Sequence, residues 1–287
     1  MTIAPSGSLH YKPFGSCARH WGLSRPASRS SRTMHKIHFI GRVLPTAFKI
    51  TVQAPEAKWV WQEAGLELTF RVKIGNSFIN AECELREYKP EFIAELYRRA
   101  FDLTRASVNL VGFAQGLGLT VLFEMFIAPD GSVTELAPMD PSLPPLCTAY
   151  SLDPVRLPDF NAVINAVFTS PDLFMALEDL IGAITLPHVA AVNCARAMDR
   201  LKHLIATAGS DDRGAWKQMR DTLQIDEAYL KYVTDVSKGP RHGRLGHTPG
   251  NLTTEGTRRS WTVMNRYFEY VKRSERPLDA TSFPPLK

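Results

Sequence analysis

Short apolar stretches bounded by glycine, proline and asparagine dominate the chain from Met34 to Leu85. They are rich in apolar and β-branched residues, a composition typical of strands. We therefore predict four strands: HKIHFIGRVL (35–44), AFKITVQA (47–54), LELTFRVKIG (66–75) and SFINAECEL (77–85).

A helix and a hairpin are predicted next. Apolar residues within 92–101 recur at helical spacing behind Pro90, which indicates a helix of roughly five turns. Segment 116–136 is predicted to form two strands joined by the turn PDGS (129–132). The apolar run 110–128 is interrupted by polar residues and glycines, so we expect a buried hairpin and no membrane span.

The second half of the chain has a helical pattern almost throughout. Helices are predicted to begin at Pro158, Pro171 and Pro187, the first two with an aspartate directly after the proline. Two amphipathic segments follow, DRGAWKQMRDTLQI and DEAYLKYVTDVSK, and a last helix opens near Thr253. Five or six such helices form a bundle.

The predicted organisation is an α+β domain at 34–140 followed by an all-α helical bundle at 158–275. A proline-rich linker (141–157) joins them. Residues 1–33 are expected to form a disordered basic tail, and residues 276–287 a frayed end.

The two halves of the chain differ in net charge. The net charge of +5 equals the excess in residues 1–33, which hold five basic residues and no acid. From Met34 up to Pro187 there are 12 basic and 18 acidic residues, and from Pro187 onward there are 17 and 11. A basic C-terminal half suits nucleic acid or another polyanion, whereas the alternative is that the two domains neutralise each other.

The four cysteines, at positions 17, 83, 147 and 194, form no CxxC pair and no regular framework. This pattern indicates unpaired thiols in a reducing compartment, so we expect a cytoplasmic protein. The Ser- and Arg-rich tail is also typical of an organelle transit peptide, but we favour a dispensable extension.

The strongest chemical signal is the segment KGPRHGRLGHTPG (238–250), predicted as a loop between two helices. It contains no acid, and its glycines and prolines let the backbone approach a ligand closely. Its cationic side chains would compete for an anion such as a phosphate; they are Lys238, Arg241, His242, Arg244 and His247. The alternative is a solvated connector.

A polar stripe is predicted on the helix that opens at Pro187. Asn193, Arg196, Arg200 and His203 are spaced 3, 4 and 3, so they share one face. They either line a binding cleft beside the loop or form an exposed face stabilised by local pairs, such as Asp199 with a neighbouring base.

The C-terminal half resembles the HEPN superfamily. The resemblance rests on an all-helical bundle over about 160–275 and on an Arg, a polar residue and a later His, here Arg241, His242 and His247. It implies a homodimeric, metal-independent endoribonuclease that cuts RNA by attack of the 2′-hydroxyl and leaves a cyclic phosphate. Arg241 would stabilise charge on the phosphate and His247 would act as general acid or base, with Asn193, Arg196, Arg200, Lys238 and Arg244 available for binding.

Many HEPN proteins are instead non-catalytic modules, so the alternative function is recognition of an anionic ligand or a protein partner. We predict no metal and no cofactor, because neither the histidines nor the glycines have the required spacing. Trp59 and Trp61 alternate on a presumed strand and would form either a stacking platform or part of the core.

Overall fold

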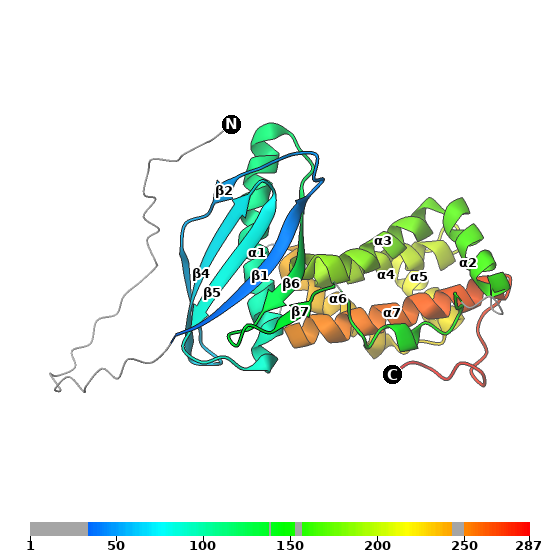
Figure 1. Cartoon of the computed structure of the whole chain (residues 1–287). Coiled ribbons are helices and arrows are strands. Elements are labelled where there is room, and N and C mark those ends of the chain that lie inside the picture. Colours follow the sequence, from blue (N-terminus) through cyan, green and yellow to red (C-terminus); the bar gives the residue numbers. More distant parts are fainter. Residues whose placement is uncertain (1–33, 138, 153–156, 243–249) are drawn as a thin grey trace. The chain divides into compact units, whose positions relative to one another are not determined.

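The computed structural model of the chain describes residues 34–137, 139–152, 157–242 and 250–287. The chain divides after Ala137 into two units, which we call the sheet unit and the helical unit. The predicted tail at 1–33 lies outside the described residues. An antiparallel sheet region is followed by several helices, which confirms the predicted fold class (Figure 1).

The sheet unit is built on one antiparallel sheet in the order β2-β4-β5-β1-β6-β7, with β3 also paired to β4. The expected strand at 47–54 is reduced to two residues, because a turn at Pro45 precedes it, in which Phe48 N donates to Pro45 O at 3.3 Å. The strands are β1 (His35–Leu44), β2 (Val52–Gln53), β3 (Ala57–Trp61), β4 (Leu66–Gly75), β5 (Phe78–Leu85), β6 (Thr120–Ile127) and β7 (Val133–Glu135).

One helix, α1 (Ile93–Gln115), covers one face of this sheet (Figure 1). Alternate strand residues face it, and Phe39 lies at the centre, with its ring centroid 5.6 Å from that of Phe123 and 5.9 Å from that of Tyr97. At a bulge between Ile40 and Gly41 the register of β1 against β6 shifts. A Cβ at Gly41 would lie 2.0 Å from the Leu122 carbonyl oxygen, so the close approach of the two strands requires glycine there.

The helical unit is arranged around α4 (Ala190–Ile205), which contacts four other helices. Its core is one apolar cluster that includes Leu180, Met198 and Phe268. The other helices are α2 (Leu157–Thr169), α3 (Pro171–Thr185), α5 (Asp212–Leu223), α6 (Glu227–Arg241) and α7 (Gly250–Lys272), and short 3-10 turns occur at Pro90–Phe92, Pro144–Leu146 and Pro187–Val189.

The proline-rich segment packs on the helical unit. Leu143 and Ala149 are buried, and the Asn265 side chain on α7 accepts hydrogen bonds from the backbone N–H groups of Thr148 and Ala149 at 2.9 and 2.8 Å. This segment has no apolar period because single side chains anchor it, not a regular face.

The C-terminal residues 276–287 are held in place, which corrects the expected frayed end. Leu278 is buried, and Leu286 N donates to Gln224 O at 3.0 Å while Asp226 N donates to Leu286 O at 2.9 Å. The Phe283 ring lies under the Arg266 guanidinium. Scattered apolar side chains and backbone hydrogen bonds hold this extended end, and neither has a sequence period.

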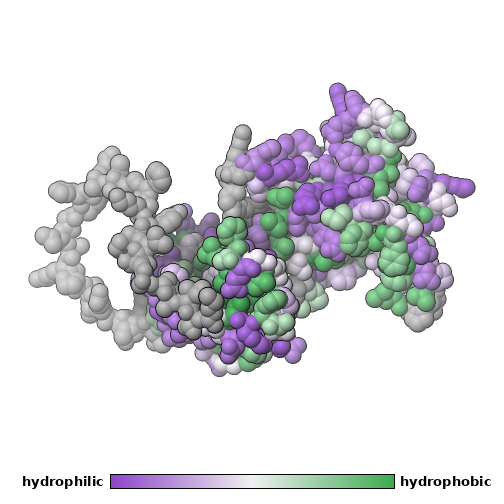
Figure 2. Space-filling view, turned by 90° about the horizontal axis from the view of Figure 1, so that it is seen from above, coloured by the Kyte–Doolittle hydropathy of each residue, from purple (hydrophilic) through white to green (hydrophobic). Residues whose placement is uncertain are grey.

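Several apolar side chains of α2 and α3 are exposed, and Figure 2 shows hydrophobic atoms gathered toward the α2 end of the helical unit. Among the described residues, no single helix has the length and apolar character to cross a membrane. Helices α2 and α3 meet that criterion only as a pair, and they are bent by 108° at their junction.

Candidate functional site

Helix α6 extends through the first residues of the segment predicted as a loop. It ends at Arg241 and includes Gly239 and Pro240, so the prediction that these residues end the helix at Lys238 was wrong. Proline removes only one backbone hydrogen bond here because it lies in the last turn, and the apolar face of α6 is buried through Leu230 and Val233. As a result, Arg241 is fixed on a helix and is not carried on a loop.

A polar groove of ≈ 980 Å³ lies beside Arg241 in the helical unit. The Arg241 guanidinium, with its side chain 38 % exposed, is 3.6 Å from the carboxylate of Asp199 on α4. Six basic and four acidic side chains line the groove: Lys202, Arg213, Lys217, Arg220, Lys231 and Arg241, with Asp199, Asp211, Asp212 and Glu227.

Lys202 forms the buried part of the groove wall. Its ammonium group is 2.5 Å from the Asp212 carboxylate and 3.5 Å from that of Asp199, and it lies 4.8 Å from the centre of the Trp216 ring. The hydrogen bond from Lys202 holds the pKa of Asp212 below its usual range. Asp199 therefore lies between two cations, Lys202 and Arg241, and links α4 to α6.

The two arginines of the predicted stripe on α4 pair with an acid on a different helix, α3. Asp179 on α3 is buried, and its carboxylate pairs with Arg196 at 3.2 Å and with Arg200 at 3.3 Å. Asn193 is also nearly buried, and its amide nitrogen would lie 2.8 Å from a Cβ placed at Gly182. These residues join α4 to α3, so their charges and amide are already used in packing.

The predicted site residues thus fall into three groups. Lys238, Arg241 and His242 lie at the end of α6, where the Lys238 ammonium is 2.5 Å from the Asp235 carboxylate. Asn193, Arg196 and Arg200 of the stripe contact α3, and Arg241 meets α4 through Asp199 and not through the stripe. Arg244 and His247 lie outside the described residues.

Sequence reasoning did not single out Lys202, Asp212 or Trp216 as site residues. The pairing of Asp199 with a neighbouring base was anticipated as a local contact, and the Asp199–Lys202 pair is present. Lys202 is drawn to Trp216 and Asp212 by the packing of α4 against α5, which no local pattern encodes.

The two tryptophans of β3 belong to the sheet unit. Trp59 and Trp61 are half-buried and stacked, with centroids 5.8 Å apart. The Arg99 guanidinium lies 4.0 Å from the Trp59 ring centre, and Phe92 meets Trp61 edge-on at 5.1 Å. The rings are thus occupied by partners from the same unit.

Two family models match the chain. Residues 37–137 match the N-terminal domain, and residues 160–272 the C-terminal domain, of a domain of unknown function designated DUF8168. No curated protein and no solved structure gives a significant match. Neither family model is described as HEPN, so that resemblance remains a proposal. The matched ranges together cover most of the described residues, and the chain belongs to the DUF8168 family, with both of its domains present in order.

Proposed function

We propose that the helical unit binds a phosphate-bearing polyanion, with RNA as the candidate, in the groove beside Arg241. The observation that carries this proposal is the state of Arg241, whose half-exposed guanidinium borders the groove and, among the described residues, pairs with one acid, Asp199, at 3.6 Å. A guanidinium held so loosely can exchange a carboxylate for a phosphate, which accepts the same paired hydrogen bonds.

The charge of the groove supports this proposal. Its walls carry two more basic than acidic side chains. The sequence directly after His242 also contains two basic residues, Arg244 and His247, and no acid up to Pro249. Contacts between basic side chains and phosphates provide most of the affinity of non-specific RNA binding, and that affinity falls as salt rises.

A more specific form of this proposal is the RNA cleavage reaction that the HEPN resemblance implies. A phosphate would replace Asp199 on Arg241, the RNA 2′-oxygen would attack the phosphorus, and the bond to the 5′-oxygen would break. One histidine, His247 or His242, would take the 2′-hydroxyl proton, and a proton would be returned to the 5′-oxygen. The arginine-to-histidine spacing in the sequence and the place of Arg241 at a groove support it.

Binding is tested by two substitutions with opposite expected effects. Arg241→Gln should weaken the binding of single-stranded RNA and flatten its salt dependence, because one phosphate contact is lost. Asp199→Asn should tighten binding, because the internal competitor for Arg241 loses its charge.

Arg86→Gln is the matched control for the binding test. Arg86 pairs with Glu67 at 3.6 Å, as Arg241 does with Asp199, but it lies in the sheet unit. Fluorescence anisotropy at several salt concentrations gives the affinities. Equal affinity of wild type and Arg241→Gln, or equal losses for Arg241→Gln and Arg86→Gln, would refute a site at the groove.

Cleavage is tested with end-labelled RNA in the presence of EDTA. A nuclease of the HEPN type predicts products with a cyclic phosphate from the wild type and loss of cleavage in Arg241→Gln and His247→Ala. It also predicts a homodimer, which light scattering measures. If the wild type binds RNA without cleaving it, the alternative function, a non-catalytic binding module, would be favoured instead.

A further inference from the structure

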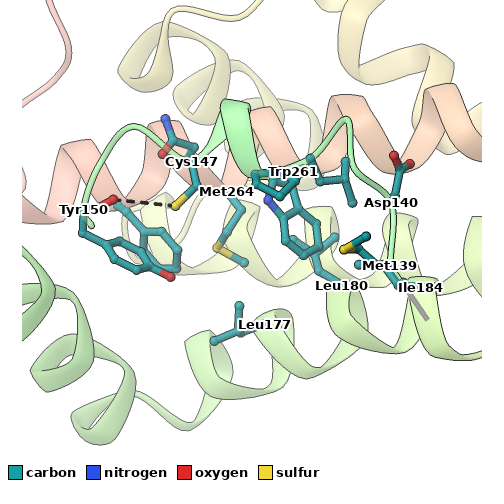
Figure 3. Close-up of a pocket in the computed structure, with 13 residues that line it drawn as sticks. Met139, Asp140, Cys147, Tyr150, Leu177, Leu180, Ile184, Trp261 and Met264 are labelled. Atoms are coloured by element: carbon teal, nitrogen blue, oxygen red, sulfur yellow. Dashed lines mark hydrogen bonds between the residues drawn. The ribbon is translucent and has the colours of Figure 1, made fainter. Parts of the chain in front are cut away.

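The helical unit contains a second cavity that shares no residue with the groove. It has a volume of ≈ 220 Å³ and lies between α3, α7 and the segment 139–150 (Figure 3). Its walls are apolar and include Leu177, Leu180, Ile184, Trp261, Met264 and Phe268. A cavity of about 150 Å³ with such walls holds benzene, whereas sites for drug-sized molecules begin at about 300 Å³. The size therefore selects a molecule with one ring and a short side chain.

Most polar groups at this cavity are already used. The Asn265 amide oxygen accepts two backbone N–H groups, and its nitrogen donates to the Thr148 hydroxyl at 2.9 Å. The Cys147 thiol lies 4.0 Å from the Tyr150 carbonyl oxygen, at the end of the cavity opposite Asp140 in Figure 3. These contacts position the segment above the cavity and engage the polar atoms of Asn265 and Cys147.

Asp140 differs from them. One of its carboxylate oxygens accepts hydrogen bonds from the Ser142 backbone N–H at 2.9 Å and from the Ser142 hydroxyl at 2.6 Å. Within the described part of the chain, its other oxygen has no hydrogen bond, and no Lys, Arg or His pairs with it. The cavity therefore combines apolar walls with a partly exposed carboxylate at its edge, one oxygen of which has no partner among the described residues.

We propose that this cavity binds a small arylalkylamine, with its ring between α3 and Trp261 and its ammonium group on the free oxygen of Asp140. Burial of the ring supplies most of the affinity because the walls are apolar. The ammonium–carboxylate contact supplies the preference for a cation, since a carboxylic acid ligand would place two like charges together.

The test uses the full-length protein and three probes with the same phenylpropyl body: 3-phenylpropylamine, 3-phenylpropanol and 3-phenylpropanoate. Isothermal titration should rank their affinities as amine first, alcohol second and carboxylate last. Equal or tighter binding of the carboxylate, or no binding of the amine, would overturn the proposal.

Two pairs of variants locate the site. Asp140→Asn should weaken the amine about two- to fivefold, the range for a solvent-accessible ion pair, and leave the alcohol unchanged. Asp130→Asn is the control, because Asp130 makes the same two hydrogen bonds to Ser132 in the sheet unit. An equal loss in both variants would remove the assigned role of Asp140.

Leu177→Trp should fill the cavity and weaken the amine and the alcohol at least about tenfold. Ile181→Trp is its control, because Ile181 lies on the same helix, is 43 % exposed and does not line the cavity. Unchanged binding in a folded Leu177→Trp variant would place the probes elsewhere.

Alkylation of the wild type gives a measurement that needs no substitution. Bound amine should slow the reaction of Cys147 with iodoacetamide, read by mass spectrometry of its peptide. Cys83 and Cys194 are buried, and burial raises the pKa of Cys83 to about 12, so they serve as unreactive references. An unchanged alkylation rate at Cys147 under saturating amine would contradict the proposal.

Discussion

At the scale of single residues, buried polar side chains in the helical unit act mainly as connectors. Asn265 on α7 holds the backbone at Thr148 and Ala149, and Lys272, about two turns later, donates to the Ala149 carbonyl oxygen at 2.5 Å. Both contacts join residues more than a hundred positions apart in sequence. They fix the segment that covers the apolar cavity.

Asn265→Ala should lower the free energy of unfolding of the helical unit by about 1–3 kcal/mol, because a buried N–H at Ala149 and a second at Thr148 lose their acceptor. Urea unfolding followed by circular dichroism measures the change. Asn161→Ala on the exposed face of α2 is the control and should have no such effect. Equal stabilities of the two variants would show that water replaces the amide.

At the scale of the elements, the close approach of β1 and β6 depends on Gly41. The side chains of β1 alternate regularly only because the bulge absorbs one residue of β6, with Ile40 opposite Met125 and Gly41 opposite Phe123. The backbone of β6 occupies the space that a side chain at position 41 would need.

Gly41→Ala should therefore destabilise the sheet unit by roughly 1–3 kcal/mol or lower its melting temperature correspondingly, as overpacking does. The control is Gly75→Ala at the end of β4, where an added Cβ would have no neighbour within 4 Å. Calorimetry measures both. Similar melting temperatures for the two variants would mean that β1 and β6 can move apart to admit the added methyl group with little loss of stability.

Strands and helices that bury one face could be predicted from the sequence. The alternating pattern of β1 and β4 and the helical spacing of α1 located these elements, because each buries one face. The extent of α6 could not be read from Gly239 and Pro240, because the burial of its apolar face outweighs one lost hydrogen bond. Local propensity yielded there to tertiary packing.

For the whole molecule, the sequence showed that one half is acidic and the other basic. It did not show which of the basic side chains are paired with acids and which border a groove. The arginines at 196 and 200 are paired with Asp179, whereas Arg241 borders an open groove. Distinguishing paired from available cations requires the distances between helices, because Asp179 and Asp199 lie 17 and 42 residues from the arginines they engage at 196 and 241.

The contact between Gly182 and Asn193 has an evolutionary consequence. Because the amide of one position fills the place of the missing side chain of the other, these two sites are not free to drift independently. A larger residue at 182 is compatible with this helix crossing only after 193 has become smaller. If related proteins keep this asparagine, the reason would thus be the packing of α3 against α4, and not the binding of a ligand.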